Sequence, residues 1–176
     1  MGTISRGVVI GRFNPPHNGH RYLLNFAQQH VDKLYVFICT LPEDEIPGML
    51  RFVWMQKLVP NAEIIHITEE NPHAVRGAPE AVKIWAETIL SNMKDGRPDY
   101  VFASEDYGQS LARELGALFI EVDSGREQFP VSASAIRSNL LKLLEYWKYI
   151  PEPVRVWFHE QLTACENIEK IEDTQN

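Results

Sequence analysis

The chain has 176 residues, of which 44% are hydrophobic, and no apolar run approaches the roughly 20 residues that a membrane-spanning helix needs. With 24 acidic against 17 basic residues, its net charge of −7 argues against nucleic acid as a partner, because such binding needs a basic surface. The length suits one domain with a full core, and Arg6 precedes any signal-like apolar stretch, so we expect a cytoplasmic protein with no membrane partner.

Short apolar runs alternate with helix-like stretches along the chain. We expect buried strands at Gly7–Ile10, Leu34–Cys39, Glu63–Ile67, Tyr100–Ala103 and Leu118–Val122. We expect helices between them at Gly19–His30, Leu50–Val59, 79–94 and Tyr107–Leu115. This alternation predicts a single-domain α/β fold, a Rossmann-like doubly wound parallel sheet covered on both faces. Ligands bind such sheets beyond the carboxyl ends of the strands, where the strand order reverses, so the segment after the first strand is the prime site.

The segment GRFNPPHNGH, residues 11–20, joins the first predicted strand to the first predicted helix. Its two prolines disfavour a helix interior, so the helix should begin near His17 or Asn18. The backbone N–H groups of Asn18, Gly19 and His20 then have no helical partner and form an anion site. A single histidine here would be better explained as a cap, but His17 and His20 together can flank one phosphate.

A second helix start is predicted in VSASAIR, residues 131–137. Ser132 is a natural N-cap, Ser134 lies in the first turn, and Arg137 lies one turn further on. Two hydroxyls and a guanidinium in this order can hold phosphate oxygens. Alone, the segment would be a plain serine-capped helix with a surface arginine; beside the two histidines, phosphate binding is favoured.

GRFNPPHNGH resembles the HxGH signature of the nucleotidyltransferase superfamily of adenylyl- and cytidylyltransferases. FPVSASAIRSN (129–139) resembles its ISSTxxR element, with Ala133 where a second serine is usual and Ser134 where threonine is usual. YVFASEDYG (100–108) and EYWKYIPEPVRVWF (145–158) narrow the resemblance to nicotinamide-nucleotide adenylyltransferases of the type fused to a ribosylnicotinamide kinase. No kinase phosphate loop, G-x-x-x-x-G-K-[ST], occurs in this sequence. We expect a nucleotidyltransferase domain over 1–165 and a polar tail over 166–176.

The resemblance implies adenylyl transfer from ATP to nicotinamide mononucleotide, giving NAD and pyrophosphate by in-line attack without a covalent enzyme intermediate. It implies His17, His20 and Arg137 as catalytic residues. The resemblance and the two helix starts together place phosphate contacts at Gly11, Arg12, Phe13, Asn18, Gly19, Ser132, Ser134 and Arg137. Mg²⁺ would be bound through the ATP phosphates with few or no protein ligands, because this ion keeps its waters, and the lack of a carboxylate pair at metal-ligand spacing agrees with that. No CxxC occurs, so a zinc site is not expected.

Four further residues are weaker candidates for contacts to the nicotinamide nucleotide or the adenosine: Arg51, Trp85, Ser104 and Tyr107. Arg51 could equally face solvent, and Trp85 fits a packed helix as well as ring stacking. We expect the aromatic residues of 145–158 to seal a helix onto the sheet, and Cys39 to be a buried thiol.

Other functions stay open. One is another transferase of the superfamily, acting on pantetheine phosphate or making CDP-linked products, and another is a non-catalytic nucleotide sensor. The sequence also leaves open the choice between nicotinamide and nicotinic acid mononucleotide, and the oligomeric state, a homo-oligomer included.

Overall fold

A computed structural model of the chain describes residues 4–68 and 79–174. Its centre is one parallel sheet in the order β3-β2-β1-β4-β5. The strands are β1 (Arg6–Gly11), β2 (Lys33–Cys39), β3 (Glu63–Ile67), β4 (Tyr100–Ala103) and β5 (Leu118–Glu121). The chain runs outward from β1 to β3 and then returns to place β4 on the other side of β1. The strand order therefore reverses between β1 and β4, which is where a ligand site is expected.

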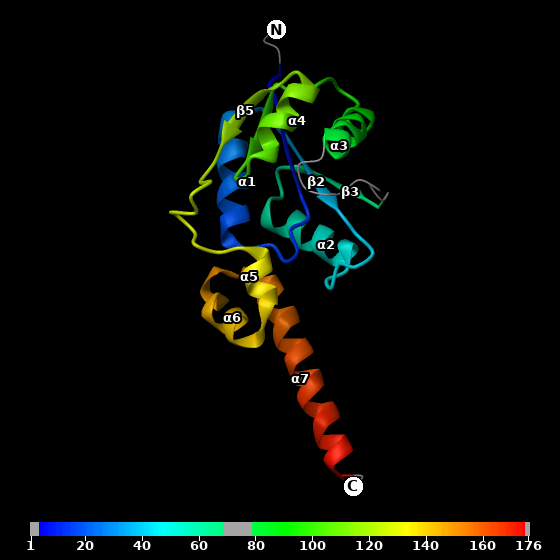
Figure 1. The fold of residues 1–176 in the computed structure, drawn as a ribbon, viewed down its shortest axis with the longest axis vertical. Helices are drawn as coiled ribbons and strands as arrows, with labels where there is room; N and C mark the ends of the chain where they lie inside the picture. The colour runs from blue at the N-terminus through cyan, green and yellow to red at the C-terminus, as the bar shows by residue number, and fades with distance from the viewer. Residues whose placement is uncertain (1–3, 69–78, 175–176) are drawn as a thin grey trace.

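Four helices cover the two faces of the sheet (Figure 1). They are α1 (Asn18–His30), α2 (Gly48–Leu58), α3 (Pro79–Asn92) and α4 (Tyr107–Leu115). Because side chains alternate along a strand, Val9 packs in a core with α1 and α2, whereas Val8 and Ile10 pack in a second core with α3 and α4. The predicted α/β fold, with a parallel sheet covered on both faces, is confirmed.

The element bounds differ from the predicted ones by at most two residues at either end. Differences of two residues occur at the end of α3, which ends at Asn92 instead of residue 94, and at the start of α2, which begins at Gly48 instead of Leu50. A Cβ atom at Gly48 would overlap the side chains of Thr40 and His66. The missing side chain therefore lets the start of α2 lie directly against the ends of β2 and β3.

The chain after β5 forms a third cluster of elements beyond the end of the sheet (Figure 1). It contains α5 (Ala133–Ser138), α6 (Leu140–Glu145), a 3-10 turn η1 (Trp147–Tyr149) and α7 (Glu152–Thr174). The expectation that the aromatic residues of 145–158 seal a helix onto the sheet is wrong. They pack instead with Ile46 and Trp54, and the rings of Trp54 and Trp157 meet edge to face at 5.8 Å. Apolar side chains of the 40–47 loop and of α2 therefore pack against the C-terminal helices.

Two further features concern the helices: the length of α7, and whether any helix could cross a membrane. The backbone of α7 continues to Thr174, so the segment 166–174 of the predicted polar tail is part of that helix. Within residues 4–68 and 79–174, no helix has both the length and the apolar character needed to cross a membrane.

Candidate active site

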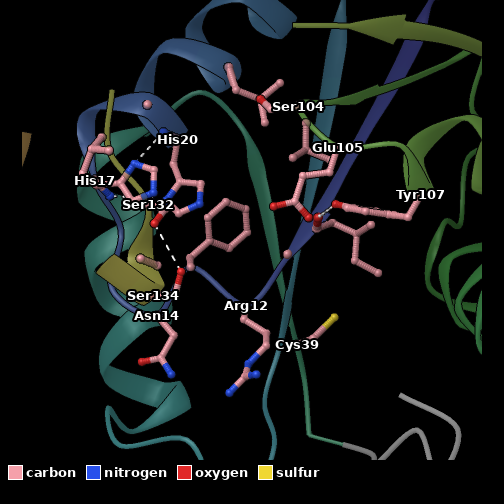
Figure 2. A pocket seen from close by; sticks show the side chains of 18 of the residues that line it. Arg12, Asn14, His17, His20, Cys39, Ser104, Glu105, Tyr107, Ser132 and Ser134 are labelled. Atoms are coloured by element: carbon pink, nitrogen blue, oxygen red, sulfur yellow. Dashed lines mark hydrogen bonds between the residues drawn. The ribbon is translucent and has the colours of Figure 1, made fainter. Parts of the chain in front are cut away.

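A cavity of about 440 Å³ opens beyond the carboxyl ends of β1 and β4, at the reversal of strand order. It brings together two motifs that lie more than a hundred residues apart in the sequence (Figure 2). Of the residues predicted to contact nucleotide, those lining it are Gly11, Arg12, Phe13, His17, Gly19, His20, Trp85, Ser104, Tyr107, Ser132, Ser134 and Arg137. Asn18 and Arg51 do not line it.

His17 and His20 form a reciprocal cap at the start of α1. The Nδ1 atom of His17 accepts the backbone N–H of His20, and the Nδ1 atom of His20 accepts the backbone N–H of His17, both at 3.3 Å. The two rings stack with their centroids 3.7 Å apart, and Phe13 meets the His20 ring edge-on at 4.9 Å. The cap predicted near His17 is confirmed, and it fixes both rings in the cavity wall. The expectation that the backbone N–H of His20 is free for an anion is wrong, because His17 Nδ1 accepts it.

This geometry sets the protonation of both histidines. Burial, and to a smaller degree the charge of Arg126, lowers the pKa of His17 from 6.5 to about 3. Burial, with smaller contributions from His17 and Arg126, lowers the pKa of His20 well below 6.5. Both rings are thus neutral at pH 7. Since each Nδ1 accepts a hydrogen bond, each ring carries its proton on Nε2, which is its hydrogen-bond donor.

Ser132, Ser134 and Arg137 form the second part of the site at the start of α5. Ser132 is the N-cap, its hydroxyl accepting the backbone N–H of Ala135 at 3.1 Å, and its Oγ lies 3.2 Å from Ser134 Oγ. Arg137 donates from Nη1 to the carbonyl oxygen of Asn14. That bond ties α5 to the loop after β1, so the serine hydroxyls and the histidine rings belong to one cavity.

Arg51 neither lines the cavity nor faces solvent, so both of its sequence interpretations are wrong. Its side chain is fully buried and donates to the carbonyl oxygens of three residues, Ile46, Cys39 and Arg12, as well as to the Asp44 carboxylate at 2.7 Å. Burial lowers the pKa of Arg51 to about 10, so the guanidinium remains charged at pH 7. Arg51 thus supports the loops behind the cavity and does not reach into it.

Asp44 connects the buried Arg51 to the wall of the cavity. Its side chain is 1% exposed and accepts hydrogen bonds from Arg12 Nη2, Arg51 Nη2 and Asn14 Nδ2. The Arg12 side chain remains 41% exposed and lines the cavity. Asp44 lies in the polar loop LPEDEIPG, and nothing in that stretch of sequence marks this residue among its acidic neighbours.

The remaining candidates differ in their roles. Asn18 is turned away, donating to the carbonyl oxygen of Lys148 at 3.4 Å. Tyr107 donates to the carbonyl oxygen of Ile10, so its hydroxyl is tied to the end of β1. Trp85 is half-buried between the core under α3 and the cavity, so both packing in the core and stacking on a ligand ring fit its position.

Cys39 is buried as expected. Burial raises the pKa of its thiol to about 12, so the thiol is not a nucleophile at neutral pH.

Three residues that were not among the candidates from the sequence also line the cavity: Glu105, Asp123 and Arg126. Glu105 follows β4 inside YVFASEDYG, so its place after a strand end was a usable signal. Asp123 and Arg126 lie in the loop after β5, where no motif pointed to them. Within the described residues, no group of three or more histidine, cysteine or carboxylate side chains could hold a metal ion.

The sequence of the chain is similar to those of several known proteins. The chain is 30% identical over 169 residues to the trifunctional NAD biosynthesis/regulator protein NadR of Escherichia coli (strain K12), an alignment that covers 86% of this chain but 40% of that protein. It is 26% identical to the nicotinamide-nucleotide adenylyltransferase of Thermococcus kodakarensis, covering 89% of this chain and 84% of that enzyme. It is also 29% identical to the phosphopantetheine adenylyltransferase of Streptococcus suis, covering 84% of this chain and 91% of that enzyme.

The fold has solved counterparts. A crystal structure of NadR protein in complex with NR matches with a TM-score of 0.64 at 20% identity, over 86% of this chain and 44% of that one. The model of the cytidylyltransferase-like family matches residues 8–169, which include both motifs of the cavity. The chain therefore belongs to the cytidylyltransferase-like family and is related to nicotinamide-nucleotide and phosphopantetheine adenylyltransferases.

Proposed function

We propose that the protein transfers the adenylyl group of ATP to nicotinamide mononucleotide, producing NAD and pyrophosphate. The observation that carries this proposal is the single cavity lined by His17, His20, Ser132, Ser134 and Arg137. Two neutral ring donors, serine hydroxyls and a guanidinium are the groups that a bound polyphosphate needs, and they converge at the switch point of a parallel sheet.

The reaction follows from this arrangement. A phosphate oxygen of the mononucleotide attacks the α-phosphorus of ATP, the bond from that phosphorus to the α–β bridging oxygen breaks, and its electron pair leaves with pyrophosphate. The acceptor phosphate is already an anion at neutral pH, so no general base is required. The Nε2–H groups of His17 and His20 stabilise the oxygens on the α-phosphorus, and Ser132, Ser134 and Arg137 hold the β- and γ-phosphates.

Mg²⁺ belongs to this proposal as a partner of ATP. When bound, it would neutralise charge on the phosphates and would keep most of its waters. The carboxylates of Glu105 and Asp123 line the cavity, but Glu105 pairs with Arg126 and Asp123 accepts backbone N–H groups. These residues fit an ion held through the phosphates, and the chain's own task is to place those phosphates.

The relatives differ in the acceptor that their names give: one is a nicotinamide-nucleotide adenylyltransferase and another is a phosphopantetheine adenylyltransferase. Beside its polar part, the cavity has an apolar part lined by Val82, Trp85, Tyr107 and Leu111. Two aromatic rings in that part suit a flat heteroaromatic ring better than the branched, flexible pantetheine chain. This favours a mononucleotide acceptor, and pantetheine phosphate is the second candidate.

One experiment tests the proposal. Purified protein is incubated with ATP and Mg²⁺ and, in parallel, with nicotinamide mononucleotide, nicotinic acid mononucleotide or pantetheine phosphate, and the products are separated by chromatography. We expect NAD with the first acceptor and release of one pyrophosphate per NAD. Product from pantetheine phosphate alone would select the second candidate. ATP binding without any product would indicate a nucleotide sensor.

A further inference from the structure

Arg126 belongs to a loop between β5 and α5 whose conformation is specific. Arg126 and Asp123 both have left-handed backbones, with φ of 53° and 50°. The carbonyl oxygen of Asp123 accepts the N–H of Arg126 at 2.9 Å, and its Oδ1 accepts the N–H groups of Glu127 and Gln128 at 2.8 and 3.2 Å. Residues with a Cβ atom rarely adopt this backbone unless surrounding contacts hold it. The hydrogen bonds of Asp123 thus hold the loop in the conformation that places Arg126 at the cavity.

Arg126 meets Glu105 at the cavity. Its Nη2 lies 3.6 Å from Glu105 Oε1, which comes from the loop after the neighbouring strand β4. The two side chains line the cavity and are 45% and 32% exposed, so a ligand can reach both. An ion pair as exposed as this one contributes little to stability. Stability therefore does not explain why an arginine and a carboxylate meet in the cavity wall.

The site needs positive charge near the histidine rings. His17 and His20 are neutral and can donate hydrogen bonds but contribute no net charge, whereas a bound nucleotide carries several negative charges. The charge of Arg126 reaches both rings, because it is one of the causes that lower their pKa values. Arg137 is bonded to the carbonyl oxygen of Asn14 and lies 4.0 Å from the exposed Glu45 carboxylate, and Arg12 is bonded to the buried Asp44. Arg126 pairs with the accessible carboxylate of Glu105 in the cavity wall, which an anion can replace.

We propose that Arg126 binds the phosphate chain of the nucleotide beside the histidine pair, and that Glu105 is the counterion which the phosphates displace. This inference rests on the proposed function, because it takes nucleotide phosphates to be the ligand. A phosphate group offers the planar guanidinium two oxygens and a larger charge than one carboxylate does. Glu105 is thus a positioning residue that holds the guanidinium in place before the nucleotide arrives.

Opposite effects of two substitutions test this exchange. Inorganic pyrophosphate is titrated into the full chain by calorimetry, without ATP or acceptor. Arg126→Gln should weaken pyrophosphate binding about tenfold, because one charged contact is lost. Glu105→Gln should tighten it about fivefold, because the competing partner of a partly exposed pair is removed. Arg113→Gln, an exposed arginine of α4 outside the cavity, should leave the affinity unchanged.

Turnover supplies a second measurement. Arg126→Gln should lower kcat for NAD formation by about 10²-fold, as expected for a group that stabilises charge in the transition state. Arg126→Lys, which keeps the charge and makes the smallest change to packing, should recover part of the binding and of kcat. Thermal unfolding midpoints establish that each variant is folded.

The outcomes separate this inference from the proposed function. Opposite shifts in pyrophosphate affinity in a protein that makes no NAD would sustain the role of Arg126 and refute the acceptor. Weaker binding in both variants would mean that the ion pair only supports the loops, and unchanged binding in both would mean that Arg126 does not touch phosphate; either result overturns the inference. A wild-type protein that does not bind pyrophosphate would also overturn the inference, whereas the proposed function is decided by NAD formation.

Discussion

His17 and His20 each accept, through Nδ1, the backbone N–H of the other residue at 3.3 Å, while their rings stack 3.7 Å apart. The same two side chains thus begin helix α1 and line the cavity. A proton on either Nδ1 would remove a cap and place a cation in a buried stack. The cap and the neutral state of the rings are therefore one structural feature, and the next two predictions follow from it.

The proposed catalytic role of the histidines can be separated from their capping role by substitution. His17→Ala and His20→Ala should each lower turnover by about 10²- to 10³-fold, because each removes a preorganised donor. His17→Ala should also lower stability by about 1 kcal/mol, the usual effect of losing an N-cap. His17→Asn keeps a cap acceptor and should restore stability but not turnover. Steady-state kinetics and urea unfolding measure the two effects.

His159→Ala is the matched control for these variants. His159 is exposed on α7, outside the cavity, so its loss should change neither turnover nor stability. Near-wild-type turnover in His17→Ala and His20→Ala would reduce the pair to a helix cap.

The low pKa values of the histidines predict acid sensitivity. Because the pKa of His17 is lowered from 6.5 to about 3, its stabilising contribution is complete above pH 6.5 and is lost as the pH falls toward 3. In that range the unfolded chain binds a proton that the folded chain excludes. The free energy of unfolding should fall by about 1.4 kcal/mol per pH unit for each such histidine.

The double variant His17→Asn with His20→Gln isolates this effect. Asparagine and glutamine suit the N-cap and N3 positions of a capping box and do not titrate. Urea unfolding between pH 7 and 4.5 should show a shallower pH dependence in the variant than in the wild type. Parallel curves for the two proteins would contradict the buried, neutral state of the rings.

The buried Arg51–Asp44 pair should be a major source of stability. Arg51→Met leaves the Asp44 carboxylate and several backbone carbonyls without this donor, and we expect a loss of about 3–5 kcal/mol in the free energy of unfolding. Asp44→Asn combined with Arg51→Met should cost less than the sum of the two single changes, because the residues share one interaction. Lys57→Met on the exposed side of α2 is the control. Additive effects would show that the two residues act independently.

Arg137 is predicted to hold ATP. Arg137→Ala should weaken ATP binding and lower turnover, with binding of the mononucleotide barely changed. Arg137→Lys should recover only part of the loss, because an ammonium cannot reproduce a two-pronged contact. Kinetics with each substrate varied in turn, with Arg113→Ala for comparison, measure this. A defect confined to the mononucleotide would place Arg137 in the acceptor subsite.

Much of the fold could be predicted from local patterns. Strands such as Tyr100–Ala103 are short, apolar and bounded by polar residues, so periodicity marks them directly. The caps at His17 and Ser132 were predictable too, because proline and serine act on the backbone within a few residues. The site residues on these two helix starts followed from the same local signals.

What could not be predicted depends on contacts between distant segments. The burial of Arg51 needs Asp44 and the carbonyl oxygens of Arg12, Cys39 and Ile46, which lie in other segments of the chain. An arginine near the start of a helix looks solvent-exposed by itself. Arg126 is placed by left-handed backbones at Asp123 and at Arg126 itself, two residue types that do not mark such a conformation in a sequence. The aromatic residues around Trp157 predicted a packed core, but only the tertiary structure shows that this core lies beyond the end of the sheet.

The bond from Arg137 to the carbonyl oxygen of Asn14 joins residues 123 positions apart. A ribosome makes the chain from its N-terminus, so all five strands exist before α5 has been synthesised. A nascent sheet would carry the histidine side of the cavity while the serine and Arg137 side was still missing. With the proposed function, nucleotide would contact both sides of the cavity, so it would stabilise the chain only after α5 has docked and would reinforce a late step of folding.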